Sequence, residues 1–365
     1  MPILEKIVIS DFRNIELQEI EFSPNVNCIS GNNGEGKTNL LDAIYYLSMT
    51  KSAFATSDKF SFRHGTDEFS LSGSYRMENG LLSRFAMKMT SKGEKKVRRD
   101  DIPYTKVSEH LGILPIVMVS PSDISMVSES GEERRRFVNS VLSQMDREYL
   151  SALQQYNRLL LQRNRMLKEA DLDRSLLEVI DMRMATYAEP VFQARRTFVD
   201  ELCPLVAEYY KAISGGSEHV DIMYDSELSK ASLDMLLEAS YDKDRVLKYT
   251  SSGVQRDDFI FMMNGHPIRR CGSQGQQKSF LVALKFAQYE IMKRKYGFAP
   301  ILLLDDVFDK LDMGRISNLL QMVASNDFGQ IFITDSNKVR MSGIVDKLTR
   351  DRAYFDTFQG TFTRI

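Results

Sequence analysis

The sequence lacks two features that would mark a disulfide-stabilised or membrane protein, because it has few cysteines and no long apolar run. Its three cysteines lie far apart, without the spacing of a metal site: Cys28, Cys203 and Cys271. An odd, scattered set argues against a disulfide framework and for a reducing compartment. No apolar run approaches the roughly 20 residues of a membrane helix, and Glu5, Lys6 and Asp11 near the start are unlike a signal peptide. We therefore expect a cytoplasmic protein with no membrane partner.

The net charge of the chain is also close to zero. The 48 basic and 50 acidic side chains leave a formal charge of −2, so any nucleic-acid surface must be a local basic patch. We find no internal repeat and no low-complexity tract. Hydrophobic residues make up 43% of the 365 positions, which is ordinary for a globular protein with a substantial core. This length allows two or three domains at roughly 100–200 residues each.

The chain changes character twice along its length. Residues 1–130 are β-rich, long charged helices follow, and α/β character returns at 253–365. The predicted strands are 3–9, 17–22, 26–30, 69–77, 81–90, 115–119, 301–305 and 331–334. We therefore expect one α/β lobe formed by 1–130 and 253–365, with a helical insert at 131–252.

Within the insert, apolar residues follow spacings of three and four: Leu177, Ile180, Met184, Tyr187, Val191, Ala194 and Phe198. This stripe suits packing against an antiparallel helix that carries Leu153, Leu160 and Leu167. Pro190 lies inside the stripe and is expected to kink or break the helix. At about 1.5 Å per residue the hairpin is no longer than about 50 Å. We interpret the stripe as core packing.

A glycine-rich run near the start predicts phosphate binding. It reads Gly31-Asn32-Asn33-Gly34-Glu35-Gly36-Lys37-Thr38 and fits the Walker A pattern G-x-x-x-x-G-K-[ST]. A predicted strand precedes it and helical spacing follows, so backbone N–H groups and a helix N-terminus would surround an anion. Lys37 would reach the β- and γ-phosphates, and the Thr38 hydroxyl would ligate Mg²⁺. We predict that the chain binds a nucleoside triphosphate.

A second nucleotide element ends the apolar run Ile301–Leu304. The paired carboxylates Asp305 and Asp306 would lie at the carboxyl end of a buried parallel strand, where α/β sheets place ligands. Asp305 would hold Mg²⁺, and Asp306 would orient or deprotonate the attacking water. A buried strand followed by a plain turn is the alternative, and the presence of Lys37 and Thr38 favours the nucleotide interpretation.

A third element, at 271–278, comes directly before a strongly helical run at 280–287. Ser273, Gln274, Gly275 and Gln276 would present a hydroxyl, backbone N–H groups and a helix N-terminus to phosphate. One nucleotide does not need two such sites from one subunit. Two subunits arranged head to tail could each lend this element to the other's γ-phosphate, which gives a C₂ homodimer. Taken alone, the segment would be interpreted as an ordinary Ser/Gly helix cap.

The order of these elements resembles the ABC-type ATPases of the SMC and Rad50 group. Within that group the chain is similar to the RecF family of DNA repair proteins along essentially its whole length. The matching strings are Asp11-Phe12-Arg13-Asn14, Ser120-Pro121-Ser122-Asp123, Arg134-Arg135-Arg136-Phe137, Tyr156-Asn157-Arg158, Gln162-Arg163-Asn164, Arg256-Asp257-Asp258, Ser273-Gln274-Gly275-Gln276-Gln277-Lys278, Pro300–Phe308 and Phe308-Asp309-Lys310-Leu311-Asp312. Positions 37 and 273 are 236 residues apart (273 − 37). The same two motifs lie much closer together in transporter nucleotide-binding domains, and they are separated by hundreds of coiled-coil residues in SMC and Rad50 chains.

The resemblance implies a fold and a function. The expected fold is an ABC-type ATPase head, with a P-loop α/β core and a β-rich N-terminal subdomain, plus a helical side lobe inserted between Walker A and the signature motif. The expected function is ATP-dependent dimerisation on duplex or gapped DNA, with slow, DNA-stimulated hydrolysis for release, alongside RecR and RecO type mediators that load recombinase. The resemblance also implies roles for single residues. The partner's nucleotide would be contacted by Ser273, Gln274 and Gly275, and Asp312 would form part of the contact across the dimer interface. Arg13 would contact nucleotide phosphate.

The sequence departs from the family pattern at three positions. Gln255 stands where the family usually has histidine before Arg-Asp-Asp. Asp335 follows Thr334 at the position of a switch histidine or threonine, and a carboxylate there would repel the γ-phosphate unless it is protonated or salt-bridged. Asp306 is one methylene shorter than the usual glutamate, so we expect slow turnover.

Two basic clusters are candidates for DNA contact. One is Lys92, Lys95, Lys96, Arg98 and Arg99, in a predicted hairpin or loop, and the other is Arg134, Arg135 and Arg136. Contacts there would be sequence-independent and sensitive to salt.

Two other functional classes stay open. An ABC-like ATPase of a defence system would usually append an effector domain, and only about 60 residues follow the acidic strand. A scaffold that binds ATP and protein partners with little or no hydrolysis is compatible with Asp306 and Asp335.

Overall fold

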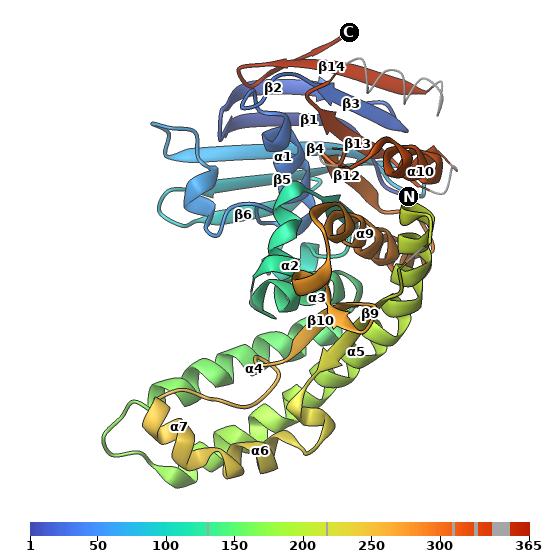
Figure 1. Cartoon of the computed structure of the whole chain (residues 1–365). Helices are drawn as coiled ribbons and strands as arrows, with labels where there is room; N and C mark the ends of the chain where they lie inside the picture. The colour runs from blue at the N-terminus through green and yellow to red at the C-terminus, as the bar shows by residue number, and fades with distance from the viewer. Residues whose placement is uncertain (130, 217, 309–310, 325–327, 338–350) are drawn as a thin grey trace. The chain divides into compact units, whose positions relative to one another are not determined.

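The computed structural model describes residues 1–129, 131–216, 218–308, 311–324, 328–337 and 351–365. The chain forms two compact units, each assembled from separate stretches (Figure 1). Unit 1 contains Met1–Asp123, Ala212–Gly215 and Lys285–Ile365, and unit 2 contains Ile124–Lys211 and Gly216–Leu284. Asp309 and Lys310 lie outside the described residues.

The boundaries of the units differ from the expected lobes. We expected 253–284 to join the ATPase lobe, but this stretch groups with unit 2. The reason is local pairing, because β10 (Asp258–Met263) forms an antiparallel ladder with β9 (Val220–Asp225) and a short one with β11 (His266–Pro267). The segment is therefore held by strands of the insert.

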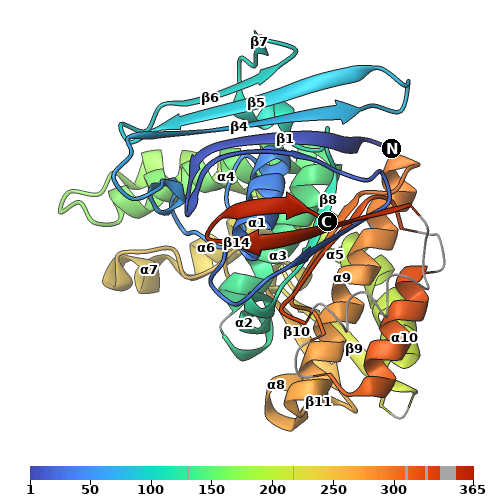
Figure 2. The ribbon, with the colours of Figure 1, turned by 90° about the horizontal axis from the view of Figure 1, so that it is seen from above.

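Unit 1 contains an antiparallel sheet in the order β2-β1-β4-β5-β6-β7. Its strands are β1 (Ile3–Phe12), β2 (Ile15–Glu21), β4 (Glu68–Arg76), β5 (Leu82–Thr90), β6 (Lys95–Arg99) and β7 (Ile102–Pro103). Figure 2 shows β1, β4, β5 and β6 side by side. Residues alternate between buried and exposed along β4 and β5, as a sheet with one covered face requires.

The second sheet of unit 1 carries the parallel strands. Its order is β15-β14-β3-β13-β12-β8, with only β15 antiparallel to its neighbour. The bounds are β3 (Val26–Ser30), β8 (Ile116–Val119), β12 (Ile301–Asp305), β13 (Ile331–Asp335), β14 (Arg352–Phe358) and β15 (Thr361–Arg364). Every residue of β3, β8, β12 and β13 is buried, which agrees with their apolar sequences.

Helix α1 (Lys37–Met49) packs against strands of both sheets and completes the core of unit 1. Edge-to-face contacts among Phe12, Tyr46 and Phe69 join the helix to the antiparallel sheet. The predicted strands near positions 3, 17, 26, 69, 81, 115, 301 and 331 are confirmed, whereas β6, β7, β9, β10, β11, β14 and β15 were not predicted.

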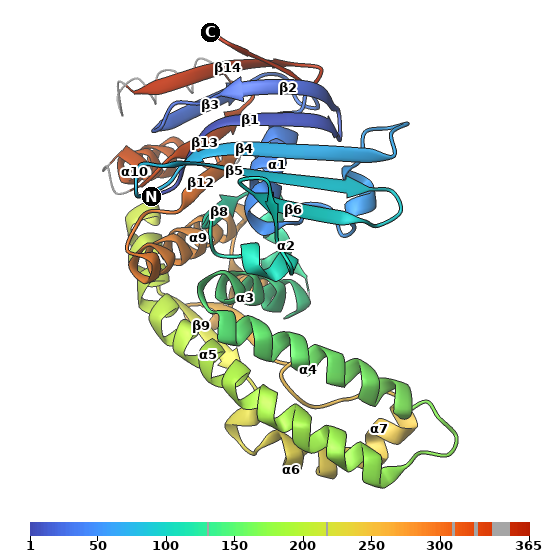
Figure 3. The same ribbon diagram turned by 180° about the vertical axis from the view of Figure 1, so that it is seen from behind.

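Unit 2 is built on an antiparallel helical hairpin of α4 (Arg147–Met166) and α5 (Arg174–Ser214), whose last residues belong to unit 1. Arg163 on α4 forms an ion pair with Asp181 on α5, and Arg195 on α5 donates a hydrogen bond to the Tyr149 hydroxyl on α4. The two helices therefore run side by side (Figure 3). The predicted hairpin is confirmed.

The expected break at Pro190 is wrong. Helix α5 continues through both Pro190 and Pro204 over 41 residues. A proline removes one backbone hydrogen bond, but Met184, Ala188 and Val191 around it are fully buried. Tertiary packing of this face maintains the helix.

The remaining helices are shorter or connect the two units. They are α2 (Ser125–Ser128), α3 (Gly131–Met145), α6 (Leu233–Ala239), α7 (Tyr241–Leu247), α8 (Ile268–Cys271), α9 (Gln274–Tyr296), α10 (Met313–Ala324) and the 3₁₀ turns η1 (Asp58–Ser61), η2 (Val107–His110), η3 (Pro121–Ile124) and η4 (Glu227–Ser229). Helix α9 begins in unit 2 and ends in unit 1. In the described ranges, no helix is both long and apolar enough to cross a bilayer.

Candidate nucleotide-binding site

The Walker A segment forms the turn between β3 and α1 that the sequence predicts. Gly34 and Gly36 adopt φ of 84° and 115°, in the left-handed region that favours glycine. Gly36 is the N-cap of α1 and supplies no side-chain cap, and the first turn of the helix has no acidic residue. The N–H groups at the start of an α-helix have no intrahelical acceptor. This helix end therefore suits an anion.

Lys37 is held inside this loop by the loop itself. Its side chain is 4% exposed, and Nζ donates to the carbonyl oxygens of Gly31 at 2.8 Å and Asn32 at 2.9 Å. Among the described residues, no carboxylate lies within ion-pair distance of this ammonium group. A buried cation without a counter-ion is costly. Asp305 attracts Lys37 without pairing with it directly, so the ammonium group can still take an anion as a direct partner.

The acidic end of the site brings together residues from three elements. The Thr38 hydroxyl of α1 donates to the Asp305 carboxylate of β12, at 3.0 Å from either oxygen. From β13, Thr334 Oγ1 donates to Asp305 Oδ1 at 2.7 Å and accepts the N–H of Asp306 at 3.1 Å. Parallel pairing of β12 with β13 places these groups at the same edge of the sheet.

Burial raises the pKa of the Asp305 carboxyl above its usual range, and the Thr334 and Thr38 hydroxyls act in the opposite direction. Thr38 and Asp305 together offer only oxygen donors, which are the ligands that Mg²⁺ prefers. Their direct hydrogen bond shows that both groups point to one spot, so the residues present fit a magnesium ion.

Asp306 and Asp335 differ in how the chain holds them. Asp306 is half-buried with φ of 43°, a conformation that Asp tolerates better than most residues. Asp335 ends β13, is 1% exposed and accepts the N–H of Asn337 at 2.8 Å. One oxygen of Asp335 is thus engaged by its own chain, and its expected repulsion of a γ-phosphate stays a prediction.

Two turns distant in sequence support the Walker A loop. Asn14, between β1 and β2, donates to the Glu35 carbonyl at 3.1 Å and accepts from the Asn39 side chain at 2.7 Å. A Cβ added to Gly36 would lie 2.8 Å from the Asn14 amide, so the two positions fit closely. From the β14–β15 turn, the Gly360 N–H donates to the Glu35 carbonyl at 2.8 Å, and the Gln359 N–H donates to the Glu35 carboxylate.

Arg13 has an internal partner in the structure. Its guanidinium lies 2.6 Å from the buried Asp42 carboxylate and 2.9 Å from Ser52 Oγ. The Arg13 side chain is 20% exposed. Its contact with a nucleotide phosphate stays a prediction, since the guanidinium would have to share or leave Asp42.

The signature segment belongs to unit 2 and begins α9. Ser273 Oγ accepts the Gln276 N–H at 3.3 Å, and Gln276 Oε1 accepts the Ser273 N–H at 2.8 Å. This reciprocal pair is a capping box, so the cap interpretation is right about local structure. Gln276 also donates to Glu218 at 2.7 Å. Ser273 and Gln274 are exposed, and Gly275 is half-buried.

The first basic cluster divides by strand alternation. On β6, Lys96 and Arg98 are exposed, whereas Lys95 pairs with Asp58 at 2.7 Å and Arg99 lies over the Phe85 ring. Lys92 is exposed in the β5–β6 turn. Lys92, Lys96 and Arg98 are therefore the most accessible of the five, and contact of this cluster with DNA stays a prediction.

Of the three arginines in the second cluster, Arg134 is buried and paired within the chain, so its predicted DNA contact is corrected, whereas contacts by Arg135 and Arg136 stay predictions. Arg134 is 6% exposed and donates to Asp258 at 2.8 and 2.9 Å. Arg135 donates to the Asp257 carbonyl at 2.7 Å. Arg136 is exposed but pairs with acids of its own helix. The cause is the packing of α3 on β10, because a buried guanidinium needs a carboxylate partner.

Sequence reasoning missed three contributors to the site: Thr334, Asn14 as a support of the loop, and the Gln359–Gly360 turn. Thr334 could have been found, because a hydroxyl at the end of the neighbouring parallel strand lies beside Asp305. The other two depend on tertiary contacts without a local pattern.

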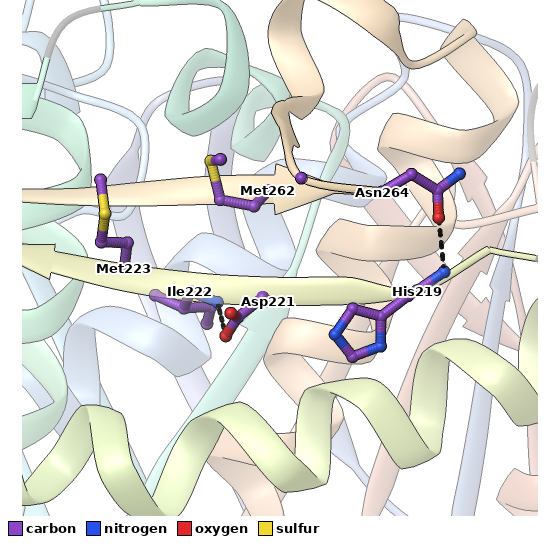
Figure 4. A pocket seen from close by; sticks show the side chains of 7 residues that line it. His219, Asp221, Ile222, Met223, Met262 and Asn264 are labelled. Atoms are coloured by element: carbon purple, nitrogen blue, oxygen red, sulfur yellow. Dashed lines mark hydrogen bonds between the residues drawn. The ribbon is translucent and has the colours of Figure 1, made fainter.

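One pocket of about 340 Å³ lies elsewhere, on the β9–β10 hairpin of unit 2 (Figure 4). It is lined by His219, Asp221, Ile222, Met223, Met262, Asn264 and Gly265. Within it, the His219 N–H donates to the Asn264 side chain at 2.9 Å and the Ile222 N–H donates to the Asp221 carboxylate at 2.7 Å. It contains none of the predicted site residues.

Together, the fold and this site define an ABC-type ATPase head. Residues 3–353 match the sequence profile of the family described as "RecF/RecN/SMC N terminal domain". The Smc head domain from Pyrococcus furiosus shares the fold at 15% identity, with a TM-score of 0.59 over 100% of this chain and 96% of that chain.

Closer relatives are more specific. A DNA replication and repair protein RecF from Parabacteroides distasonis is 43% identical over 98% of both chains, and one from Bacteroides thetaiotaomicron is 41% identical over 100% of this chain and 99% of its own. The solved structure of "the recombination mediator protein RecF-ATP in RecFOR pathway" superimposes with a TM-score of 0.90 at 29% identity, over 100% of this chain and 98% of the other. The chain belongs to the RecF family.

Proposed function

We propose that this chain is an ATP-dependent DNA-binding clamp of recombinational repair and replication restart. ATP drives two copies to dimerise on duplex or gapped DNA, and slow hydrolysis releases them. The close relatives are named for DNA replication and repair, and a solved relative holds ATP in a pathway named RecFOR. The partners that this predicts are RecR and RecO type mediators.

The observation that carries the proposal is the convergence of Lys37, Thr38, Asp305, Thr334 and Asp306 in unit 1. Lys37 and the start of α1 bind the phosphates of ATP, because both present positive potential that no carboxylate among the described residues pairs with directly. Thr38 and Asp305 hold Mg²⁺, which neutralises developing charge when bound.

Asp306 prepares the nucleophile. Its carboxylate orients a water molecule or accepts its proton, while the Thr334 hydroxyl fixes the Asp306 backbone. The short aspartate reaches less far than glutamate, which predicts slow hydrolysis. Steady-state turnover well above ~1 s⁻¹, the low end of typical enzyme rates, would contradict this expectation.

The signature segment completes the site from a second copy. Ser273 is exposed at the start of α9, and its Oγ accepts the Gln276 N–H, so the hydroxyl proton can be donated to a γ-phosphate presented by the partner. Reciprocal donation gives a C₂ homodimer with two nucleotides between the subunits.

The test is binding of the full chain to a gapped duplex, followed by fluorescence anisotropy at one fixed salt concentration, with and without Mg-ATP. We expect ATP to tighten DNA binding severalfold for wild type and not for Lys37→Met. If ATP binds and DNA affinity does not change, an ATP-gated switch that acts on protein partners is the better assignment. DNA-stimulated turnover, lost in Asp306→Asn, would separate an ATPase from a scaffold.

A further inference from the structure

One exposed face of α4 carries arginines and no acid. At 3.6 residues per turn, each residue of an α-helix is rotated by about 100° about the axis from the one before it. Exposed residues of α4 that lie within about 60° of the direction of Arg147 form a single stripe along the helix. We call this stripe the α4 arginine face, and its members are Arg147, Ser151, Gln154, Arg158, Leu161, Gln162 and Arg165. The sole acid of α4, Glu148, is about 100° away from this direction.

The three arginines of this face have no counter-charge. Within the part of the chain that the structure describes, the guanidinium groups of Arg147, Arg158 and Arg165 make no ion pair and no hydrogen bond. Arg163 on the opposite face of the helix is fully buried, and it pairs with Asp181 and with Asp244 at 2.6 Å each. The fold thus neutralises the inward arginine and leaves the outward ones available.

The neighbouring helix shows what an ordinary solvated face looks like. Exposed positions of α5 mix signs, as in Arg174, Glu178, Arg183 and Glu189. Arg174 pairs with Glu178 one turn later. Mixed charge of this kind supports a helix in solvent and calls for no ligand. The α4 arginine face lacks this pattern.

The spacing of the face suits an extended polyanion. Arg147 and Arg158 are about 16 Å apart along the axis, and Arg158 and Arg165 about 10 Å, at 1.5 Å per residue. Gln154 and Gln162 add amide donors between them. Arginine binds phosphate through two parallel hydrogen bonds, and duplex DNA presents phosphates continuously along such a length.

We propose that the α4 arginine face binds the phosphodiester backbone of DNA without regard to sequence. This inference rests on the proposed function and assigns DNA contact to a surface other than the two predicted basic clusters. Backbone contacts position a protein and carry no sequence information directly. An acidic protein partner is the alternative occupant, and the experiment separates the two.

The experiment uses the full chain and the triple variant Arg147→Gln, Arg158→Gln and Arg165→Gln. The control triple is Lys230→Gln, Lys243→Gln and Lys248→Gln, exposed side chains of the same unit with the same change in charge. Affinity for a gapped duplex is measured in Mg-ATP over a series of salt concentrations, with the unfolding midpoint as a check on folding. A third variant replaces the three arginines by lysine.

We expect the arginine triple to bind DNA at least tenfold more weakly, equally for unrelated sequences. The slope of log affinity against log salt should fall by up to about 2.7, which is 0.9 for each lost phosphate contact. The control should stay within about twofold of wild type, and the lysine variant should retain most of the salt dependence.

Three results would overturn the assignment. If wild type binds DNA and the arginine triple matches the control, the face is not a DNA contact, although the proposed function survives. Binding of the same proteins to poly-glutamate is measured in parallel, and if the triple loses affinity for poly-glutamate and keeps that for DNA, the occupant is an acidic protein. If wild type itself does not bind DNA in Mg-ATP, the proposed function and this inference fail together.

Discussion

Two groups of buried charges in the molecule differ in what neutralises them. In the nucleotide site of unit 1, Lys37 is held by carbonyl oxygens, and Asp305 is held by the hydroxyls of Thr38 and Thr334. Neutral groups stabilise these charges only in part. The site is therefore suited to a ligand that brings a phosphate to Lys37 and a cation to Asp305.

In unit 2 the fold supplies the opposite charge itself. Arg195 is 1% exposed and donates to the equally buried Asp257 at 2.6 Å, to the Val254 carbonyl at 2.6 Å and to Asn139 at 3.0 Å. Arg163 pairs with Asp244 in the same manner. Such charges hold α4 and α5 to the segment that returns to β10, and they are not available to a ligand. A buried charge is therefore a functional candidate where its own chain leaves it without a counter-ion.

The largest effect that we expect is on the stability of unit 2. Arg195→Met leaves the Asp257 carboxylate buried without its partner, which should lower the free energy of unfolding by about 3–5 kcal/mol. The double variant Arg195→Met with Asp257→Leu should recover part of this loss, because no buried charge remains. Urea unfolding of the three proteins measures the effect. If Arg195→Met lowers the free energy of unfolding by less than about 1 kcal/mol, the Arg195–Asp257 pair does not hold unit 2 together. The proposed difference between the two groups of buried charges would then be wrong.

Next in size is the effect of Asp306→Asn on turnover. The amide keeps the size and shape of the carboxylate but cannot accept a proton, so ATP hydrolysis should fall about 10²-fold or more. ATP affinity should change little, because Lys37 and the helix start remain. The matched control is Asp101→Asn, an exposed aspartate that also has positive φ. Equal turnover in wild type and Asp306→Asn would assign the water-activating role to another residue.

A third case, His110, sharpens the comparison because the fold accommodates this buried group as the neutral form. Its ring is fully buried against Phe85 and Tyr104, and Nε2 lies 2.7 Å from the Leu47 carbonyl. Burial lowers the pKa of His110 from 6.5 to about 4.

Below pH 6.5 the unfolded chain therefore binds a proton that the folded chain excludes. The stability that depends on neutral His110 is fully present above pH 6.5, and it is lost as pH falls toward 4, by up to about 3 kcal/mol. Unfolding free energies of wild type and His110→Gln, measured at intervals from pH 7.5 to 4.5, should converge as pH falls. Parallel curves would mean that His110 does not titrate in this range.

The same comparison explains how much could be predicted from sequence. Walker A and the strand that ends at Asp305 are local patterns whose chemistry is set by neighbours in the chain, so both were predicted with their bounds. The hairpin of α4 and α5 followed from its apolar period. Arg134 was misinterpreted as a DNA contact, because no local signal shows that β10 brings Asp258 against it.

Other differences have the same origin. Residues 253–284 left the expected lobe because β10 pairs with β9 across about 40 residues of chain, and Pro190 did not break α5 because tertiary packing outweighed a local preference. The support of the Walker A loop by Asn14 and by the Gln359–Gly360 turn joins the two ends of the chain, and neither residue type is diagnostic.

The smallest expected effect tests that support. Asn14→Ala removes the donor to the Glu35 carbonyl and the acceptor for Asn39, so the loop loses hydrogen bonds worth about 1 kcal/mol. If the loop must be held in shape to bind phosphate, this cost falls on ATP affinity, which should weaken about fivefold while the unfolding midpoint changes little. Asn79→Ala, in the turn between β4 and β5, is the matched control and should leave ATP affinity unchanged. If Asn14→Ala lowers the unfolding midpoint and binds ATP as wild type does, Asn14 stabilises the fold and does not position the loop. Its hydrogen bonds would then resemble the structural pairs of unit 2, even though they lie within the nucleotide site.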